Sequence, residues 1–401
     1  MTTPEAKKER RLPVGTMILA LLVVIFLGVA VNRFANGLGA VSNMSDGRAW
    51  GLWIPFDLFC GVPLAAGGFT MAAIVYIFNN KKYLPLARPA ILTAFIGYLL
   101  VVFALLVDLG QPWHIFRMIW NPNIHSPLYE VGWCVMLYNV VLALEFAPAI
   151  FEKLRELHLP APTWKIPLRT LHMIEIPLII AGIVISTGHQ NSLGSMLLLM
   201  GNDLNQLWYT PILPLLFFLH AVCVGPAMVI IEATVSSKVF GHKLDIGIFS
   251  GLGKILCIPL VIYLLFKVGD IVVAGEVGAL FSEFPANAWW WAEMIIGVVL
   301  PLIMFLLPVV QKSRGWLFVS ALLVVLGLIL NRFNVTLMNL EMRPGYGTYF
   351  PTWMEIAVSV GLFSGGMIVI MLANKFLPVM KHDEGHGESH KEKLTEAPAS
   401  A

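Results

Sequence analysis

Charged side chains are scarce in this chain of 401 residues. They make up 12% of the sequence, whereas soluble domains carry about 25%. Hydrophobic residues make up 58%, and the mean hydropathy is +0.79. The formal net charge of +2 is too small to indicate a nucleic-acid partner. The composition therefore excludes an ordinary soluble domain and indicates a protein whose surroundings are lipid.

Cysteine is also sparse, and no C-x-x-C pair occurs. Iron–sulfur clusters and structural zinc sites need clustered cysteines, so we expect no metal site in this chain. A P-loop and a G-x-G-x-x-G fingerprint are missing as well. Any chemistry must then use polar groups inside the membrane or the redox centres of a partner. The four isolated cysteines are Cys60, Cys134, Cys223 and Cys257.

Long apolar runs are abundant, and about 20 consecutive apolar residues suffice to span a bilayer as a helix. They predict an all-α integral membrane protein with about ten transmembrane helices in residues 14–378. A short segment, 1–13, precedes them, and a polar tail that we expect to be disordered, 379–401, follows. The runs are 14–33, 52–79, 87–109, 127–151, 166–188, 211–235, 246–274, 288–310, 315–339 and 353–378.

Lysine and arginine are distributed unevenly between the turns on the two sides. If the N-terminus is cytoplasmic, the inner segments hold nineteen of these residues and the outer segments five. Cytoplasmic loops carry such an excess, so both termini are predicted to be cytoplasmic. The basic start is followed by an apolar run of full spanning length, which favours an uncleaved anchor over a signal peptide.

One apolar run begins and ends with an acid. Residues 130–145 read EVGWCVMLYNVVLALE. Glu130 and Glu145 lie about 22 Å apart along a helix and face approximately the same side. Charged groups are costly within a bilayer and usually mark function. The spacing favours a proton relay, although each acid could instead pair with a basic residue and only hold helices together.

Two further groups of charges leave the same alternatives open. Arg169, His172 and Glu175 share a helix face, where they could continue a relay or pair with one another. Lys267 and Asp270 are three residues apart, and a local ion pair would account for both.

Five sequence blocks resemble the NrfD/PsrC family of quinone-interacting membrane subunits, specifically its ten-helix HybB/DsrP-like branch. The matching blocks span nearly the whole chain. They are WGLWIPFD (50–57), ARPAILTAFIGY (87–98), ALEFAPAIFE (143–152), GHQNSLGS (188–195) and GYGTYFPTWMEI (345–356).

The resemblance implies an architecture and a function. Two four-helix bundles, about 52–188 and 211–339, would be flanked by the first and last helices. Menaquinone or ubiquinone would bind near the outer face of a bacterial or archaeal cytoplasmic membrane. An iron–sulfur subunit docked on that face, part of a hydrogenase, sulfur or cytochrome complex, would exchange electrons with the quinone.

The resemblance also implies roles for single residues. Tyr98, Glu130 and Glu145 match the family's tyrosine and its two membrane glutamates, and would carry protons. The expected quinone-pocket residues lie near the outer ends of the predicted helices. They are Asp57, Asp108 and His189.

Three alternatives compete with this prediction: a bound haem, a transporter or channel, and a pure membrane anchor. A haem needs two axial histidines, and His172, His189 and His220 lie at different expected depths, so a haem is not expected. A secondary transporter or proton channel would fit the helices and buried charges, and broken helices or inverted repeats would favour it. A pure membrane anchor would not need the buried acids.

Overall fold

The computed structural model describes residues 14–45, 47–158, 160–240, 245–342 and 348–379. The segment 1–13 and all but the first residue of the predicted tail lie outside this part of the chain. Within it, nine helical segments are long and apolar enough to span a membrane, and a bent pair forms a tenth. The prediction of an all-α integral membrane protein with about ten spanning helices is thereby confirmed.

The first group of spanning helices packs around residues of α4 (Leu84–Asp108). This helix contacts α3 and α6, and α6 in turn contacts α8. The α6 helix begins at a Ser126 cap, whose hydroxyl accepts from the backbone N–H of Tyr129, followed by Pro127 at the first position. The members of the group are the span Ile54–Ile77, which includes α3 (Gly67–Ala72), then α4, α6 (Pro127–Glu156), and α7 (Ala161–Met173) with α8 (Glu175–Leu198).

The second group packs around α15 and α9. Its tightest contact joins Gly297 to Gly327, where a Cβ on Gly327 would lie 2.1 Å from the Cα of Gly297. The two helices therefore approach backbone to backbone, which only glycine allows. The members are α9 (Leu213–Phe240), α10 (Ile246–Ala274), the span Ala286–Leu306 with α12 (Ala286–Met294) and α13 (Leu300–Leu306), and α15 (Arg314–Phe333).

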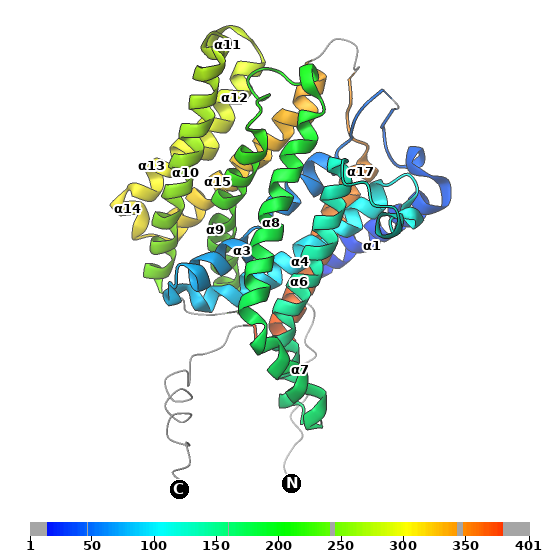
Figure 1. Cartoon of the computed structure of the whole chain (residues 1–401), viewed down its shortest axis with the longest axis vertical. Helices are drawn as coiled ribbons and strands as arrows, with labels where there is room; N and C mark the ends of the chain where they lie inside the picture. Colours follow the sequence, from blue (N-terminus) through cyan, green and yellow to red (C-terminus); the bar gives the residue numbers. More distant parts are fainter. Residues whose placement is uncertain (1–13, 46, 159, 241–244, 343–347, 380–401) are drawn as a thin grey trace.

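The two groups meet where α9 packs on α8 and α3, and the flanking helices α1 (Val14–Asn36) and α17 (Trp353–Phe376) pack on each other and on α4 (Figure 1). We name the two ends of the molecule after α1. At the Val14 end, α1 and α4 begin and α6 and α17 finish. At the Asn36 end, the same helices have their other termini. Figure 1 shows α7 at the bottom and α11 (Ala279–Ser282) at the top, so the Val14 end is down in this view.

The fifth predicted span differs from the sequence-based boundaries. It is broken into α7 and α8, which meet at an angle of 62°. It also does not end at residue 188, because α8 continues to Leu198. The polar block 188–195 resembles a turn, but Ser192 and Ser195 donate to carbonyls one turn back, at 2.9 and 3.1 Å. Gly194 then lets this last part of α8 pack on the backbone at Pro214. His189 consequently lies inside the helix and not at its outer end.

Candidate functional site

Three aromatic side chains from three helices meet inside the first group. Tyr98 comes from α4, Tyr138 from α6 and His189 from α8, and all three are at most 1% exposed. The hydroxyl of Tyr98 lies 3.1 Å from Nδ1 of His189. The ring centroids of Tyr98 and Tyr138 are 4.6 Å apart, in an edge-on arrangement. We call these three residues the aromatic cluster.

Several buried polar atoms in and beside the aromatic cluster have no hydrogen-bond partner within the described chain. Among the described residues, Nε2 of His189 and both amide atoms of the neighbouring Gln190 are buried without a hydrogen-bond partner. Buried polar atoms are nearly always satisfied, so unpaired ones in a packed interior call for an explanation, such as water or a ligand. Tyrosine and histidine can both pass protons, which makes this cluster a candidate site for proton-coupled chemistry.

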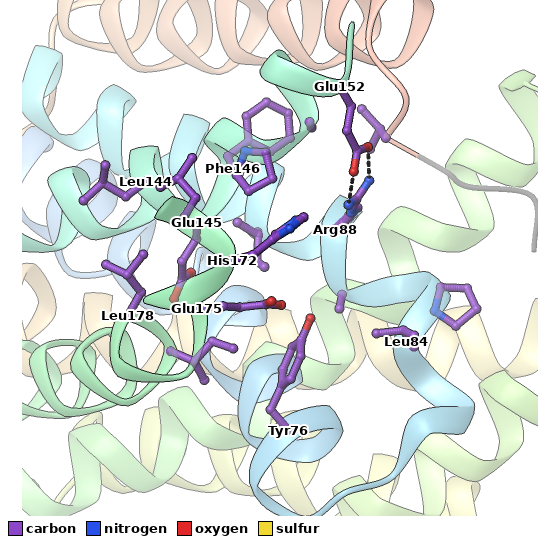
Figure 2. Close-up of a pocket in the computed structure, with 18 residues that line it drawn as sticks. Tyr76, Leu84, Arg88, Leu144, Glu145, Phe146, Glu152, His172, Glu175 and Leu178 are labelled. Carbon is purple, nitrogen blue, oxygen red and sulfur yellow. Dashed lines mark hydrogen bonds and ion pairs between the residues drawn. The ribbon is translucent and has the colours of Figure 1, made fainter. Parts of the chain in front are cut away.

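Glu145 lies on α6 seven residues beyond Tyr138, about 10 Å along the helix axis toward the Val14 end. It lines a cavity of ≈ 460 Å³ between α4, α6, α7 and α8. Figure 2 shows the side chains of Glu145, Glu175 and His172 projecting into this space, with the hydroxyl of Tyr76 pointing toward Glu175. The walls between these polar groups are mostly leucine, isoleucine, proline and alanine.

The break between α7 and α8 helps to form this cavity. His172 lies in the last turn of α7, Glu175 begins α8, and both are exposed. On the facing side Arg88 binds Glu152 through two hydrogen bonds of 2.9 and 3.0 Å. Arg88 is the charged residue that α4 contributes to the lining of the cavity, and Glu152 neutralises it. The acids that stay available in the cavity are therefore Glu145 and Glu175.

Glu145 is placed beside another acid. The group that acts on it most strongly through its charge is Glu175, and its Oε1 sits over Gly182, where a Cβ would come within 3.0 Å. The ion pairs found among the described residues do not include Glu145. The alternative in which Glu145 only neutralises a buried cation thus has no support in this geometry. Two carboxylates that share an open cavity can exchange protons with water.

Glu130 lies apart from these groups. It is exposed in the first turn of α6, eight residues and about 12 Å from Tyr138. The structure therefore places Glu145 and the aromatic cluster in the interior of the first group but leaves Glu130 at the surface of the Asn36 end.

Asp57 and Asp108 lie together, at the junction of the first group with the flanking helices. Asp57 accepts a 2.7 Å hydrogen bond from Ser359 of α17 and interacts electrostatically with Asp108. The guanidinium of Arg33 in α1 lies near Asp108 and donates to the carbonyls of Val107, at 2.6 Å, and Leu109. The three expected pocket residues thus fall in two places, because His189 belongs to the aromatic cluster. None of the three lines the cavity.

The neighbouring loop at the Asn36 end is fixed by a buried acid, Glu355. It caps α17 together with Thr352 and accepts from the hydroxyl of Tyr349. Burial raises the pKa of Tyr349, and the hydrogen bond to Glu355 raises it further. Tyr349 therefore remains a donor at any physiological pH.

Sequence reasoning missed Tyr76 and Gln190. Tyr76 stands in an ordinary apolar run, and only the break after α7 brings Glu175 to its hydroxyl. Gln190 belongs to a block that resembles a turn, and its burial depends on the continuation of α8. The one signal for Gln190 in the sequence is that it directly follows His189, which was already proposed for the site.

Comparison with known proteins identifies the family. The chain belongs to the NrfD family, described as polysulphide reductase, NrfD, which it matches over residues 40–340. It is 32% identical to the probable Ni/Fe-hydrogenase 2 b-type cytochrome subunit of Escherichia coli, over 91% of this chain and 92% of that protein.

Two proteins of Nitratidesulfovibrio vulgaris are also similar. One is the integral membrane subunit of menaquinone reductase, with 30% identity over 95% of both chains. The other, whose name states no function, is 37% identical over 94% of this chain and 97% of its own length. The resemblance that the sequence blocks indicated is thereby confirmed.

Proposed function

We propose that this chain is the membrane subunit of a quinone-linked respiratory redox complex of the bacterial or archaeal cytoplasmic membrane. Similar proteins are named as subunits of a hydrogenase and of a menaquinone reductase. The chain is not a complete enzyme. Its partner is an iron–sulfur subunit at the Asn36 end, and its substrate is menaquinone or ubiquinone, bound in the first group of helices.

The hydrogen bond between Tyr98 and His189 carries this proposal. A quinone takes up two protons with two electrons, so its site needs a proton donor held in place in a dry interior. Tyr98 and His189 form such a pair, and Nε2 of the histidine is left for a ligand. Asp57 and Asp108 lie on the Asn36 side of this pair and would form the outer part of the pocket.

Protons would reach this pair from the Val14 end. Most lysines and arginines belong to the segments at that end, and this excess supports a cytoplasmic position for it under the positive-inside rule. The cavity lies there as well, and its acids Glu175 and Glu145 lead toward Tyr138. Glu130, exposed at the other end, would serve the outer side of the same path.

We also propose that the chain carries no haem, although the E. coli relative is named a b-type cytochrome subunit. One nitrogen of His189 faces Tyr98, and the ring of His220 stacks on Tyr263 at 4.5 Å in the other group of helices. An optical spectrum of the purified subunit should show no reducible Soret band.

The break between α7 and α8 favours one competing function, a secondary transporter or proton channel without redox activity. Broken helices beside a polar cavity are typical of transporters, and the 62° bend borders such a cavity. Purification separates the two functions, because a quinone-linked subunit should bring an iron–sulfur protein with it and a transporter should not.

The proposed pocket is tested with His189→Ala and Asp108→Asn in the purified complex. Electron exchange with a soluble quinone should fall, inhibition by a quinone analogue should weaken, and the complex should still assemble. His125→Ala, an exposed histidine near the Asn36 end, is the control and should behave as the unmodified protein.

Two outcomes would contradict the proposal. Unchanged kinetics and unchanged inhibitor affinity in both variants would show that the pocket lies elsewhere. A loss of inhibitor affinity in Glu175→Gln, without one in His189→Ala, would place the quinone in the cavity at the Val14 end.

A further inference from the structure

The second group of helices contains buried polar and charged side chains that take no part in the site described above. They come from α9, α10, α12 and α15, and each is at most 4% exposed. We call them the charge cluster. Its members are His220, Lys267, Glu293, Asn331 and Arg332.

Glu293 of α12 is well supplied with hydrogen-bond donors. Its Oε2 accepts from Trp208 at 3.0 Å and from Asn334 at 2.8 Å, and its Oε1 accepts from Asn331 at 3.1 Å. Three neutral donors stabilise a carboxylate in its charged form. Both carboxylate oxygens of Glu293 are therefore satisfied by neutral donors.

Arg332 of α15 supplies the matching positive charge. It donates to the side-chain oxygen of Asn331 at 2.8 Å and to the carbonyls of Phe59 and Phe217 at 3.3 and 3.4 Å. Its guanidinium also lies over the Phe217 ring. Arginine does not lose its proton in proteins. Asn331 bonds to both Glu293 and Arg332, so the carboxylate and the guanidinium of the cluster are already matched to each other.

Lys267 is the surplus charge of the cluster. Its ammonium group has three hydrogens to donate, yet it reaches the carbonyl of Leu207 at 3.4 Å and Glu293 only at 4.0 Å. The local ion pair with Asp270 that the sequence left open is not the one that forms, because Asp270 accepts a 2.6 Å hydrogen bond from Thr210. Because Glu293 and Arg332 already match each other, the charge cluster does not need a positive charge on Lys267.

We infer that Lys267 is a proton-exchange site, separate from the quinone site of the first group. Its ammonium group loses one proton to water, so that an N–H bond breaks, and the water passes a proton on to the carboxylate of Asp270, where an O–H bond forms. Asp270 lies three residues nearer the Asn36 end, about 4.5 Å along α10, and is partly exposed. The proton then passes to water, and the reverse steps reload the lysine.

The surroundings of Lys267 fit an exchange of this kind. The groups that interact with it electrostatically are Glu293 from α12, Arg332 from α15, and His220 from α9, with Asp270 on its own helix. The ring of His220 stacks on Tyr263, and its nitrogens make no well-formed hydrogen bond within the described chain, although Asn331 is close to them. Arg332 connects this cluster to the first group through the carbonyl of Phe59. A change of charge during quinone turnover in the first group would therefore act on Lys267 through the nearby Arg332.

The inference rests on the proposed function, and the test measures both in one preparation. The complex is placed in liposomes, and electron transfer to quinone and the accompanying proton movement are recorded together. Lys267→Met should assemble, keep its electron transfer, and lose proton movement by about tenfold or more. Lys267→Arg, permanently charged, should show the same loss. Lys254→Met, an exposed lysine of α10, is the control.

A purely structural ion pair gives a different pattern. Lys267→Arg would then restore yield and proton movement, and Lys267→Met would fail to assemble, which would overturn the inference. Unchanged proton movement in Lys267→Met would overturn it as well. Should neither variant assemble, Asp270→Asn decides, since it should lose proton movement with electron transfer retained, and an unaffected Asp270→Asn would contradict the inference.

Absence of quinone-linked electron transfer in the unmodified complex would instead refute the proposed function. Proton movement driven by an imposed electrical potential still reports on Lys267 in that case. It should be slower in both Lys267 variants than in the unmodified protein, and equal rates would overturn the inference.

Discussion

The two groups of helices bury polar side chains in different ways. In the first group the aromatic cluster consists of side chains that need no counter-charge, and the acids Glu145 and Glu175 lie in a cavity. In the second group Glu293 and Arg332 are held in a dense network of hydrogen bonds. A charge inside a membrane protein must either reach water or be compensated where it lies. In the first group the acids reach a cavity, whereas in the second group Glu293 and Arg332 are compensated by neighbouring side chains.

This difference predicts opposite responses to substitution. Changes at Glu145 in the first group should reduce function with little effect on stability, whereas changes at the compensated carboxylate of Glu293 or at the tight helix contact of Gly327 in the second group should reduce stability first. Three substitutions test the comparison, in order of decreasing effect on folding.

Glu293→Ala should have the largest effect. It removes the carboxylate that compensates Arg332 and leaves the donors of Trp208 and Asn331 without their acceptor. Breaking a buried pair in this way costs about 3–5 kcal/mol. The yield of folded protein in detergent and its thermal unfolding midpoint should both drop sharply. Glu156→Ala, which removes an exposed acid paired with Lys153, should change neither, and an equally stable Glu293→Ala would show that the network is not essential for folding.

Gly327→Ala should have an intermediate effect. The added methyl group would lie 2.1 Å from the Cα of Gly297, so α15 and the span Ala286–Leu306 would have to separate. Overpacking of this kind costs about 1–3 kcal/mol. The thermal midpoint should fall, whereas Gly269→Ala on α10, where no atom lies within 4 Å, should not lower it through a clash. A wild-type midpoint in Gly327→Ala would mean that the helices can separate at little cost.

Glu145→Gln should have the smallest effect on folding and a large effect on rate. The glutamine keeps the side-chain volume but cannot titrate, and the strongest charged neighbour of Glu145 is an acid rather than a cation. The yield should be normal, and quinone-linked turnover should fall by about tenfold or more. Glu156→Gln on the same helix is the matched control. Low yield would support a structural pair, and normal yield with a normal rate would remove Glu145 from the proton path.

Much of the fold could be predicted from sequence. The spanning helices follow from the apolar runs, because a helix in lipid must satisfy its own backbone and needs about 20 apolar residues to do so. The site could be predicted only in part. Tyr98 and His189 are 91 residues apart, and their contact depends on how α4 and α8 pack. The end of the fifth span was predicted ten residues too early, because serine hydroxyls satisfied by the preceding turn look like turn residues in a sequence.

The sequence by itself determined that this protein lies in a membrane, that it has about ten helices, and that it belongs to the NrfD family. These properties depend on composition and local order, which the chain carries residue by residue. Only the tertiary structure decided which polar groups meet: His189 with Tyr98, Glu145 with Glu175 across the cavity, and Lys267 with Glu293 in preference to Asp270. The physical reason is that the cost of a buried charge is set by its neighbours in space, and these come from helices far apart in the chain.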